Sequence, residues 1–169
     1  ARMLDGIEVK TGVDYLADKD YWNMQAAEVI YTGALDEYYG YDAGRLEYRS
    51  LTFDTMRVDV RQFQGAAMMN YCDLDVPYTR IWDWSWFWPR DVAHTVITAE
   101  YPAAVGERYY PVNDAVNNTI HAKYAERASK AGWLHIGGRL GAYRYWNIDQ
   151  AIGAAMAKVE RLLEREVMA

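Results

Sequence analysis

The sequence of 169 residues is poor in the residues that build disulfides and metal centres. Cys72 is the single cysteine, so no disulfide can form within the chain, and a reducing, cytoplasmic location is expected. The histidines stand apart from one another and from Cys72, so no metal-ligand spacing is present and no metal site is expected: His94, His121 and His135.

The chain also lacks the patterns of nucleic-acid and membrane proteins. Its net charge is -6 and it has no basic run, which argues against nucleic acid or a membrane surface as a partner. No apolar stretch approaches a bilayer span, and the first residues lack the apolar segment of a secretory signal. We therefore expect a soluble protein.

Tyrosine and tryptophan are abundant, with 15 Tyr and 7 Trp against 3 Phe. Their polar atoms suit wet ligands such as sugars and nucleotides. The same residues also pack well on pleated sheets, and composition favours this second explanation. The length fits one domain or two small lobes with a real core.

Alternating and apolar runs predict a β-rich chain with helices near its end. Because several strands follow one another without helices, we expect an antiparallel meander. A polar loop is expected at 17–24. The predicted strands cover residues 7–10, 27–31, 44–60, 63–72, 78–88 and 95–100.

Tryptophan recurs at every second position of the predicted strand 78–88, which puts four of them on one strand face. Packing or a subunit contact is the favoured explanation, and a sugar-stacking platform is the alternative. The four are Trp82, Trp84, Trp86 and Trp88.

Two helices are predicted, each with a cap and an apolar stripe. The first begins at Asn113 or Asp114, ends near Ala131 before Gly132, and carries the stripe Val116, Ile120, Tyr124 and Ala128. The second covers about 148–167 after a capping box of Asn147 and Gln150. Its expected buried face is Ile148, Ile152, Met156, Val159 and Leu163.

Residues 137–150 predict a site for an anionic ligand, such as a nucleotide cofactor. An apolar strand leads into Gly137, Gly138 and Arg139, and a helix begins shortly afterwards. Glycines allow close backbone approach, arginine offers a fork of donors, and a helix N-terminus attracts anions. The usual G-x-G-x-x-G fingerprint after a strand is absent.

Arginines and tyrosines at the ends of predicted strands and turns would suit a diphosphate. Taken singly, each arginine is better explained as a solvated surface residue. The candidates are Arg49, Arg80, Tyr110, Arg139 and Tyr145, with Glu100 as a nearby carboxylate.

An ordered set of motifs across nearly the whole chain resembles bacterial UDP-galactopyranose mutase. The resemblance covers the C-terminal part of that family and lacks its N-terminal flavin-binding segment and its helical domain. The motifs are Tyr-Thr-Gly-Ala-Leu-Asp at 31–36, Tyr-Arg-Ser-Leu at 48–51, Phe-Gln-Gly at 63–65, Val-Pro-Tyr-Thr-Arg-Ile at 76–81, Glu-Tyr-Pro at 100–102, Tyr-Tyr-Pro-Val-Asn-Asp at 109–114 and Gly-Gly-Arg-Leu-Gly-x-Tyr-Arg-Tyr-x-x-x-Asp-Gln at 137–150.

The resemblance implies an isomerase that interconverts UDP-galactopyranose and UDP-galactofuranose for cell-wall polysaccharide biosynthesis. Reduced FAD is the family's cofactor and acts through a flavin N5–sugar adduct without net redox change. A UDP-galactose nucleotide sugar would be the substrate partner, and self-association is left open. Because the flavin-binding and helical parts are missing, we expect the 169-residue chain to be inactive alone.

Site residues follow from the resemblance position by position. Catalytic roles fall to Arg49, Arg80, Glu100 and Asn147, and substrate binding to Arg80, Tyr110, Tyr145 and Asn70. Cofactor contacts fall to Val9, Thr32, Gly33, Gly138, Arg139, Ile148, Asp149 and Gln150. The chain departs from the family at Asn147, where Asp is usual, and at Trp146, where Tyr is usual.

The expected fold is mixed α/β, with an antiparallel sheet as the substrate lobe. A closing strand and the C-terminal helix would complete a Rossmann-like flavin lobe. The expected segments are a partial flavin lobe at 1–38, the sheet lobe with one helix at 39–130, and the closing strand and helix at 131–169. A non-catalytic module that binds sugar or nucleotide is the alternative.

Overall fold

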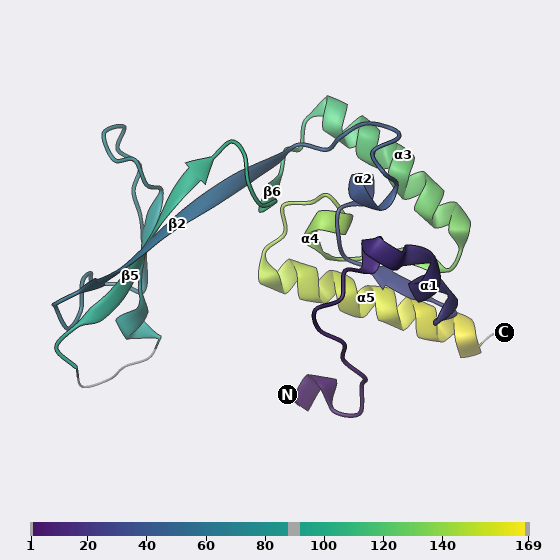
Figure 1. The fold of residues 1–169 in the computed structure, drawn as a ribbon, viewed down its shortest axis with the longest axis horizontal. Helices are drawn as coiled ribbons and strands as arrows, with labels where there is room; N and C mark the ends of the chain where they lie inside the picture. Colours follow the sequence, from purple (N-terminus) through teal and green to yellow (C-terminus); the bar gives the residue numbers. More distant parts are fainter. Residues whose placement is uncertain (1, 88–91, 168–169) are drawn as a thin grey trace. The chain divides into compact units, whose positions relative to one another are not determined.

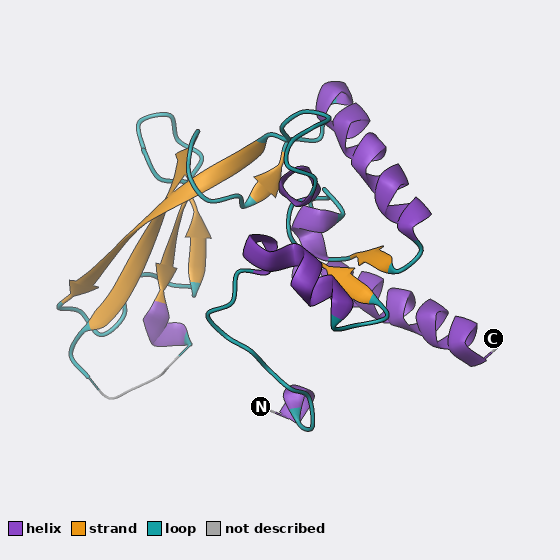
Figure 2. Ribbon diagram, turned by 45° about the vertical axis from the view of Figure 1, so that its right-hand side comes forward, coloured by secondary structure: helices purple, strands orange, loops and turns teal. Residues whose placement is uncertain are grey.

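The computed structural model describes residues 2–87 and 92–167, and the chain divides into two compact units (Figure 1). The helical unit comprises residues 1–45 and 118–169, and the sheet unit comprises residues 46–117. Helices and strands are both present, with an antiparallel sheet, so the predicted mixed α/β class is confirmed (Figure 2).

The bounds of the units differ from the predicted segments at residues 39–45 and 118–130, which fall in the helical unit. Helix α3 (Ala115–Ala131) belongs to the helical unit from Asn118 onward, whereas the sequence placed residues 39–130 in one lobe. The assignment of the two units to a flavin lobe and a substrate lobe stays a prediction.

Five strands form the sheet of the sheet unit, in the order β3-β4-β5-β2-β6 with every neighbouring pair antiparallel. The long strand β2 pairs with β5 rather than with the next strand in the chain, so the order is not that of a simple meander. The strands are β2 (Tyr48–Val58), β3 (Met68–Asn70), β4 (Arg80–Asp83), β5 (Thr95–Ala103) and β6 (Tyr110–Pro111).

One face of this sheet carries the small core of the unit. Ile81, Ile97 and Ala99 are buried there, and a group of tyrosine rings packs edge-to-face beside them: Tyr71, Tyr78 and Tyr101. Alternation along β4 and β5 sends these apolar residues to one side. The abundance of tyrosine is therefore partly explained by sheet packing.

The predicted tryptophan ladder is wrong, because β4 ends at Asp83. The Asp83 carboxylate accepts the Ser85 backbone N–H at 3.1 Å and starts a 3-10 turn, η3 (Trp84–Trp86). The stacked pair Trp82–Trp84, with ring centroids 6.4 Å apart, remains as packing. Trp88 lies outside the described residues.

The predicted strand 63–72 is also shorter than expected, since only β3 is extended there.

The helical unit is built around a short parallel pair of strands. Strand β1 (Val29–Tyr31) pairs with β7 (Leu134–Ile136). Tyrosine rings fill the space beside them, Tyr31 and Tyr38 with centroids 4.9 Å apart. The other elements are η1 (Arg2–Leu4), η2 (Tyr15–Asp18), α1 (Lys19–Met24), α2 (Leu35–Tyr38), α4 (Gly138–Gly141) and α5 (Ile148–Val167).

Two N-terminal predictions are wrong. Residues 7–10 form no strand and are exposed. Residues 17–24, predicted as a loop, lie in η2 and α1, because the Asp14 side chain accepts the Leu16 backbone N–H at 2.9 Å and caps the turn.

Helix α3 begins as predicted, with the Asp114 carboxylate accepting the Asn117 backbone N–H at 2.7 Å. It ends before Gly132, whose φ of 78° suits a helix C-terminus. Tyr124 and Ala128 are fully buried, but Val116 is exposed and is not part of the buried stripe.

Helix α5 has the predicted bounds, and the Gln150 Oε1 accepts the Asn147 backbone N–H at 2.9 Å, as in a capping box. Its predicted buried face is wrong. The exposed fractions of these side chains range from 42% to 80%: Ile148, Ile152, Met156, Val159 and Leu163.

Candidate functional site

Three predicted site residues lie in a single row across the sheet. Arg80 on β4 stands directly opposite Asn70 on β3 and opposite Glu100 on β5. Directly opposed residues of antiparallel strands project from the same face. The structure therefore brings Asn70, Arg80 and Glu100 together on the sheet face opposite to the apolar core.

Arg80 is held in this row by its neighbours. Its Nε donates to the Asn70 Oδ1 at 3.2 Å and lies 3.8 Å from the Glu100 Oε1. The exposed fraction of Glu100 is 5%, whereas Arg80 is half-buried. The buried carboxylate helps to fix the arginine, whose side chain remains 30% exposed and so can meet an anion.

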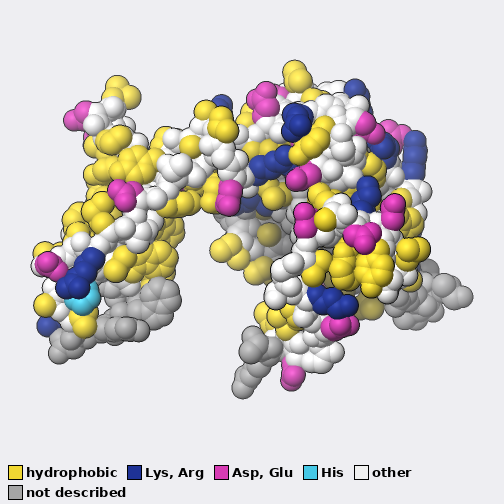
Figure 3. All heavy atoms as spheres, in the orientation of Figure 1, with side chains coloured by type: hydrophobic (Ala, Val, Ile, Leu, Met, Phe, Trp, Pro, Cys, Tyr) yellow, Lys and Arg dark blue, Asp and Glu magenta, His cyan; other side chains and the backbone are white. Residues whose placement is uncertain are grey.

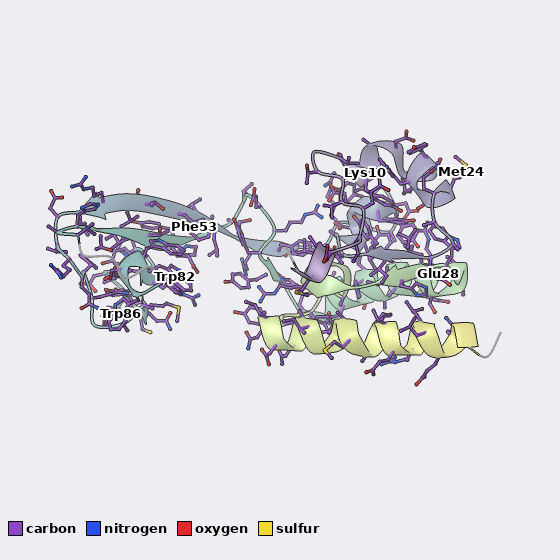
Figure 4. The ribbon with its side chains drawn as sticks, turned by 90° about the horizontal axis from the view of Figure 1, so that it is seen from below. Lys10, Met24, Glu28, Phe53, Trp82 and Trp86 are labelled. Carbon is purple, nitrogen blue, oxygen red and sulfur yellow. The ribbon has the colours of Figure 1, made fainter. Side chains whose placement is uncertain are left out.

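Arg49 and Tyr110 form a second pair on the same sheet. They are directly opposed where β2 meets β6. Arg49 is four positions from Phe53, which pairs with Glu100, so alternation along β2 places Arg49 on the face that carries Arg80. Figure 4 labels Phe53 and Trp82 on this sheet. At ~3.3 Å per residue, Arg49 and Phe53 are separated by about 13 Å along β2.

Trp82 belongs to this surface, although the sequence assigned it to packing. Its Nε1 lies 3.4 Å from the Glu100 Oε2, and the Arg80 guanidinium lies 5.9 Å from its ring centroid. Since Trp82 is two residues after Arg80, strand alternation alone was the signal that could have found it. Hydrophobic side chains gather over the visible face of the sheet unit in Figure 3.

The predicted cofactor residues meet within the helical unit, where β1 and β7 end side by side. The Gly137 backbone N–H donates to the Tyr31 carbonyl at 2.9 Å. A Cβ on Gly138 would lie 3.1 Å from the Thr32 Cβ. Thr32, Gly33 and Gly138 are thus neighbours at the carboxyl ends of parallel strands, the usual place for a ligand in α/β folds.

Gly138 is expected to resist substitution. Its φ is 69°, where a side chain is strained, and a Cβ there would lie only 3.1 Å from the Thr32 Cβ, so Thr32 would have to shift. We expect Gly138→Ala to lower the free energy of unfolding by about 2 kcal/mol. Urea unfolding monitored by fluorescence measures this.

Gly132 provides the matched control for that substitution. Its φ is 78°, but nothing lies within 4 Å of a Cβ built there. Gly132→Ala therefore reports the backbone strain alone, and the crowding against Thr32 is the extra loss at Gly138. Equal losses at the two positions would contradict the close approach.

Arg139 is engaged by the loop that follows it. Its Nε donates to the Trp146 carbonyl at 2.9 Å, its Nη2 donates to the same oxygen, and its guanidinium lies 5.2 Å from the Tyr145 ring centroid. Arg139 thus shapes the loop 142–147 and presents Tyr145, which is 58% exposed. Its predicted direct contact with a cofactor stays a prediction.

The remaining candidates lie at the start of α5 and near the N-terminus. Ile148, Asp149 and Gln150 form the first turn of α5, and Asn147 precedes it with an exposed side chain. Val9 lies in an irregular, exposed segment.

Two classes of site find no support in the described residues. Within residues 2–87 and 92–167, no group of three or more His, Cys, Asp or Glu is arranged to hold a metal ion. No helix in the same part of the chain has the length and apolar character to cross a membrane.

Comparison with known sequences identifies relatives along most of the chain. A family profile described as UDP-galactopyranose mutase matches residues 1–145. A probable UDP-galactopyranose mutase of Klebsiella pneumoniae is 38% identical over 141 residues, which are 81% of this chain and 36% of the relative. A dTDP-fucopyranose mutase of Escherichia coli is 35% identical over 136 residues, 78% of this chain and 36% of the relative.

Comparison with solved structures supports the fold. A crystal structure of reduced UDP-galactopyranose mutase has a TM-score of 0.57 at 16% identity, covering 71% of this chain and 37% of that one. The chain therefore spans little more than a third of the length of the relatives it matches.

Proposed function

Because the chain belongs to the UDP-galactopyranose mutase family, we propose that it supplies the diphosphate-binding surface of an isomerase that interconverts UDP-galactopyranose and UDP-galactofuranose. The observation that carries this proposal is the row Asn70–Arg80–Glu100, with the pair Arg49–Tyr110 on the same sheet face. Two arginines and a phenol along one surface suit a sugar diphosphate.

Arg80 and Arg49 would act on charge that develops as the bond between the sugar and the diphosphate breaks. A guanidinium already fixed by Glu100 and Asn70 needs no reorganisation at that moment. Tyr110 and Tyr145 would add neutral donors to the phosphate oxygens. Glu100 is the positioning residue for Arg80, and its second oxygen is steadied by the Trp82 indole N–H.

FAD fits the corner formed by β1, β7 and α4. The support is that β1 and β7 run parallel and end side by side there, which is a usual ligand position in α/β folds. Thr32, Gly33, Gly138, Arg139 and the first turn of α5 would hold it, with Val9 as a further proposed contact. Reduced FAD, when bound, would supply the nucleophilic chemistry at the anomeric carbon.

Asn147 would have a reduced role compared with the family's usual aspartate. It retains hydrogen-bonding atoms for a sugar hydroxyl and stands before α5, but it carries no negative charge. A cytoplasmic location is part of this proposal, supported by the single Cys72 and the nucleotide-sugar substrate.

The 169-residue chain is expected to show no turnover by itself, since it spans about a third of its relatives. The assay is chromatographic conversion of UDP-galactofuranose with dithionite-reduced FAD. Measurable conversion by the chain alone would contradict this expectation.

A chimera tests the function itself. It places this chain in the Klebsiella pneumoniae relative instead of the matched region. We expect the chimera to bind FAD and to convert the sugar nucleotide. A folded, FAD-loaded chimera without turnover would overturn the proposal.

The sugar nucleotide has a second candidate, because a dTDP-fucopyranose mutase is nearly as similar as the UDP-galactopyranose mutase. Turnover assays of the chimera with the UDP-galactose and the dTDP-fucose nucleotide show which of the two is the better substrate. A non-catalytic sugar-binding module is the other alternative, and it predicts that the chain binds galactose but not UDP in parallel titrations.

A further inference from the structure

Trp82 belongs to an aromatic cluster that the proposed function leaves unexplained. The Trp82 and Trp84 rings are stacked with centroids 6.4 Å apart, and the Phe87 ring lies 6.2 Å from the first and 5.4 Å from the second. The Arg80 guanidinium lies 5.9 Å from the Trp82 ring centroid. The cluster therefore stands directly beside the arginine that we assign to the diphosphate.

Met68 extends this cluster along the same sheet face. It stands directly opposite Trp82, on β3, and its exposed fraction is 37%. The exposed fraction of Phe87 is 47%, and Trp82 is half-buried. These three side chains, named here the Trp82 surface, form an apolar border to the row Asn70–Arg80–Glu100: Met68, Trp82 and Phe87. Figure 4 labels Trp82 in this part of the sheet.

The indole N–H groups of the cluster are used within the protein. The Trp82 Nε1 lies 3.4 Å from the Glu100 Oε2, and the Trp84 Nε1 donates to the Thr98 Oγ1 at 2.9 Å. An indole has a single donor and no acceptor, so neither tryptophan has a polar atom left for a ligand. A group that rests on the Trp82 surface therefore meets carbon and sulfur atoms rather than hydrogen-bond partners.

The sugar is the part of the substrate that reaches this surface. In the proposed function Arg80 meets the diphosphate, and the hexose is bonded directly to that diphosphate. The bond that breaks lies at the sugar, and Glu100, which positions Arg80, also receives the Trp82 N–H. The hexose would thus lie next to the Trp82 ring, whose apolar face suits the C–H groups of a sugar.

Resting on the proposed function, we infer that the Trp82 surface selects a 6-deoxyhexose nucleotide over the corresponding hexose nucleotide. Galactose and 6-deoxygalactose differ only by the hydroxyl on C6, outside the sugar ring. Against the Trp82 surface a methyl group packs on apolar atoms, whereas a hydroxyl loses water without gaining a partner. An apolar site rejects an added hydroxyl by up to about a hundredfold.

The test compares two nucleotides that share their base and differ by one oxygen: UDP-galactofuranose and UDP-6-deoxygalactofuranose. The chimera is assayed with both, and the unmodified Klebsiella pneumoniae relative gives the reference, since the two proteins differ only in the matched region. We expect the ratio of kcat/KM, deoxy sugar over galactose, to be roughly tenfold higher in the chimera than in the relative.

The outcomes separate this inference from the proposed function. A chimera that converts the galactose nucleotide with a ratio no higher than the reference overturns the inference and leaves the proposed function standing. A folded, FAD-loaded chimera that converts neither nucleotide overturns both.

Met68→Gln in the chimera identifies the surface responsible. The amide places a donor and an acceptor opposite Trp82, so the C6 hydroxyl gains partners and the ratio should fall about tenfold. Met69→Gln is the matched control, because Met69 is 41% exposed but stands opposite Ile81 on the other sheet face. It should leave the ratio unchanged. Equal ratios in the two variants would show that the Trp82 surface does not select the sugar.

Discussion

Arg80→Ala in the chimera is expected to lower kcat/KM for the sugar nucleotide by roughly 10²–10³-fold. The side chain is fixed between Asn70 and Glu100 and points from the face that we assign to the diphosphate. Its loss removes charge stabilisation and also leaves the buried Glu100 without its cation. Initial rates at several substrate concentrations measure the change.

Two further arginine variants make this result specific. Arg80→Lys keeps the charge but loses the planar fork, so its kcat/KM should fall between those of the chimera and Arg80→Ala. Arg57→Ala removes an exposed arginine of β2 whose partner is Asp59, and it should leave the rate unchanged. If Arg57→Ala and Arg80→Ala have equal effects, Arg80 has no special place in the site.

Local sequence signals predicted the long elements well. Alternation over 44–60 predicts β2, and the Asp114 and Asn147–Gln150 caps predict the starts of α3 and α5. These signals depend only on residues close together in the sequence, so they hold independently of the tertiary structure. The short N-terminal helix α1 was missed, because its sequence is polar and its own N-cap residue, Asp18, makes no capping hydrogen bond.

Tertiary features could not be predicted from local patterns. Period two correctly placed Trp82 on a strand, but Asp83 ended that strand through contacts with residues 63, 64 and 95. For α5, the apolar stripe was read as a buried face, which assumes that the covering layer is present. In the described residues these side chains are 42–80% exposed instead.

The site was predictable from the family resemblance rather than from spacing. Asn70, Arg80 and Glu100 are ten and twenty residues apart, and they share a row only because of the register between β3, β4 and β5. Strand register is fixed by the whole sheet, so no single segment reveals it. The corner where β1 and β7 end was easier to predict, since Gly137 and Gly138 directly follow an apolar strand.

Asp83→Ala is expected to destabilise the sheet unit by about 3 kcal/mol. The carboxylate is fully buried and accepts hydrogen bonds from the Phe63 and Gln64 backbone, from the Ser85 backbone and hydroxyl, and from the Thr95 hydroxyl. Alanine removes the acceptor of all these donors, of which only the Thr95 hydroxyl has a second one, the Val96 carbonyl at 3.3 Å. Urea unfolding followed by fluorescence of the adjacent Trp82 and Trp84 measures the loss.

Acidification should act on the same group. Burial alone would raise the pKa of Asp83, but the hydrogen bonds from Ser85, Thr95 and Phe63 outweigh it and hold the pKa below its usual value. The stabilisation is therefore present above the unfolded pKa, about 3.9, and is lost as the pH falls through the lower folded value. The difference in stability between the native chain and Asp83→Ala should shrink below that pH.

Asp54→Ala provides the control for both experiments, because Asp54 is an exposed carboxylate on β2. Its effect should stay within about 0.5 kcal/mol. Asp83→Asn keeps one acceptor oxygen but turns an NH₂ group toward existing donors, so it should recover little of the stability. If Asp83→Asn matches the native chain at neutral pH, the negative charge contributes nothing and the Asp83 carboxylate does not organise the turn after β4.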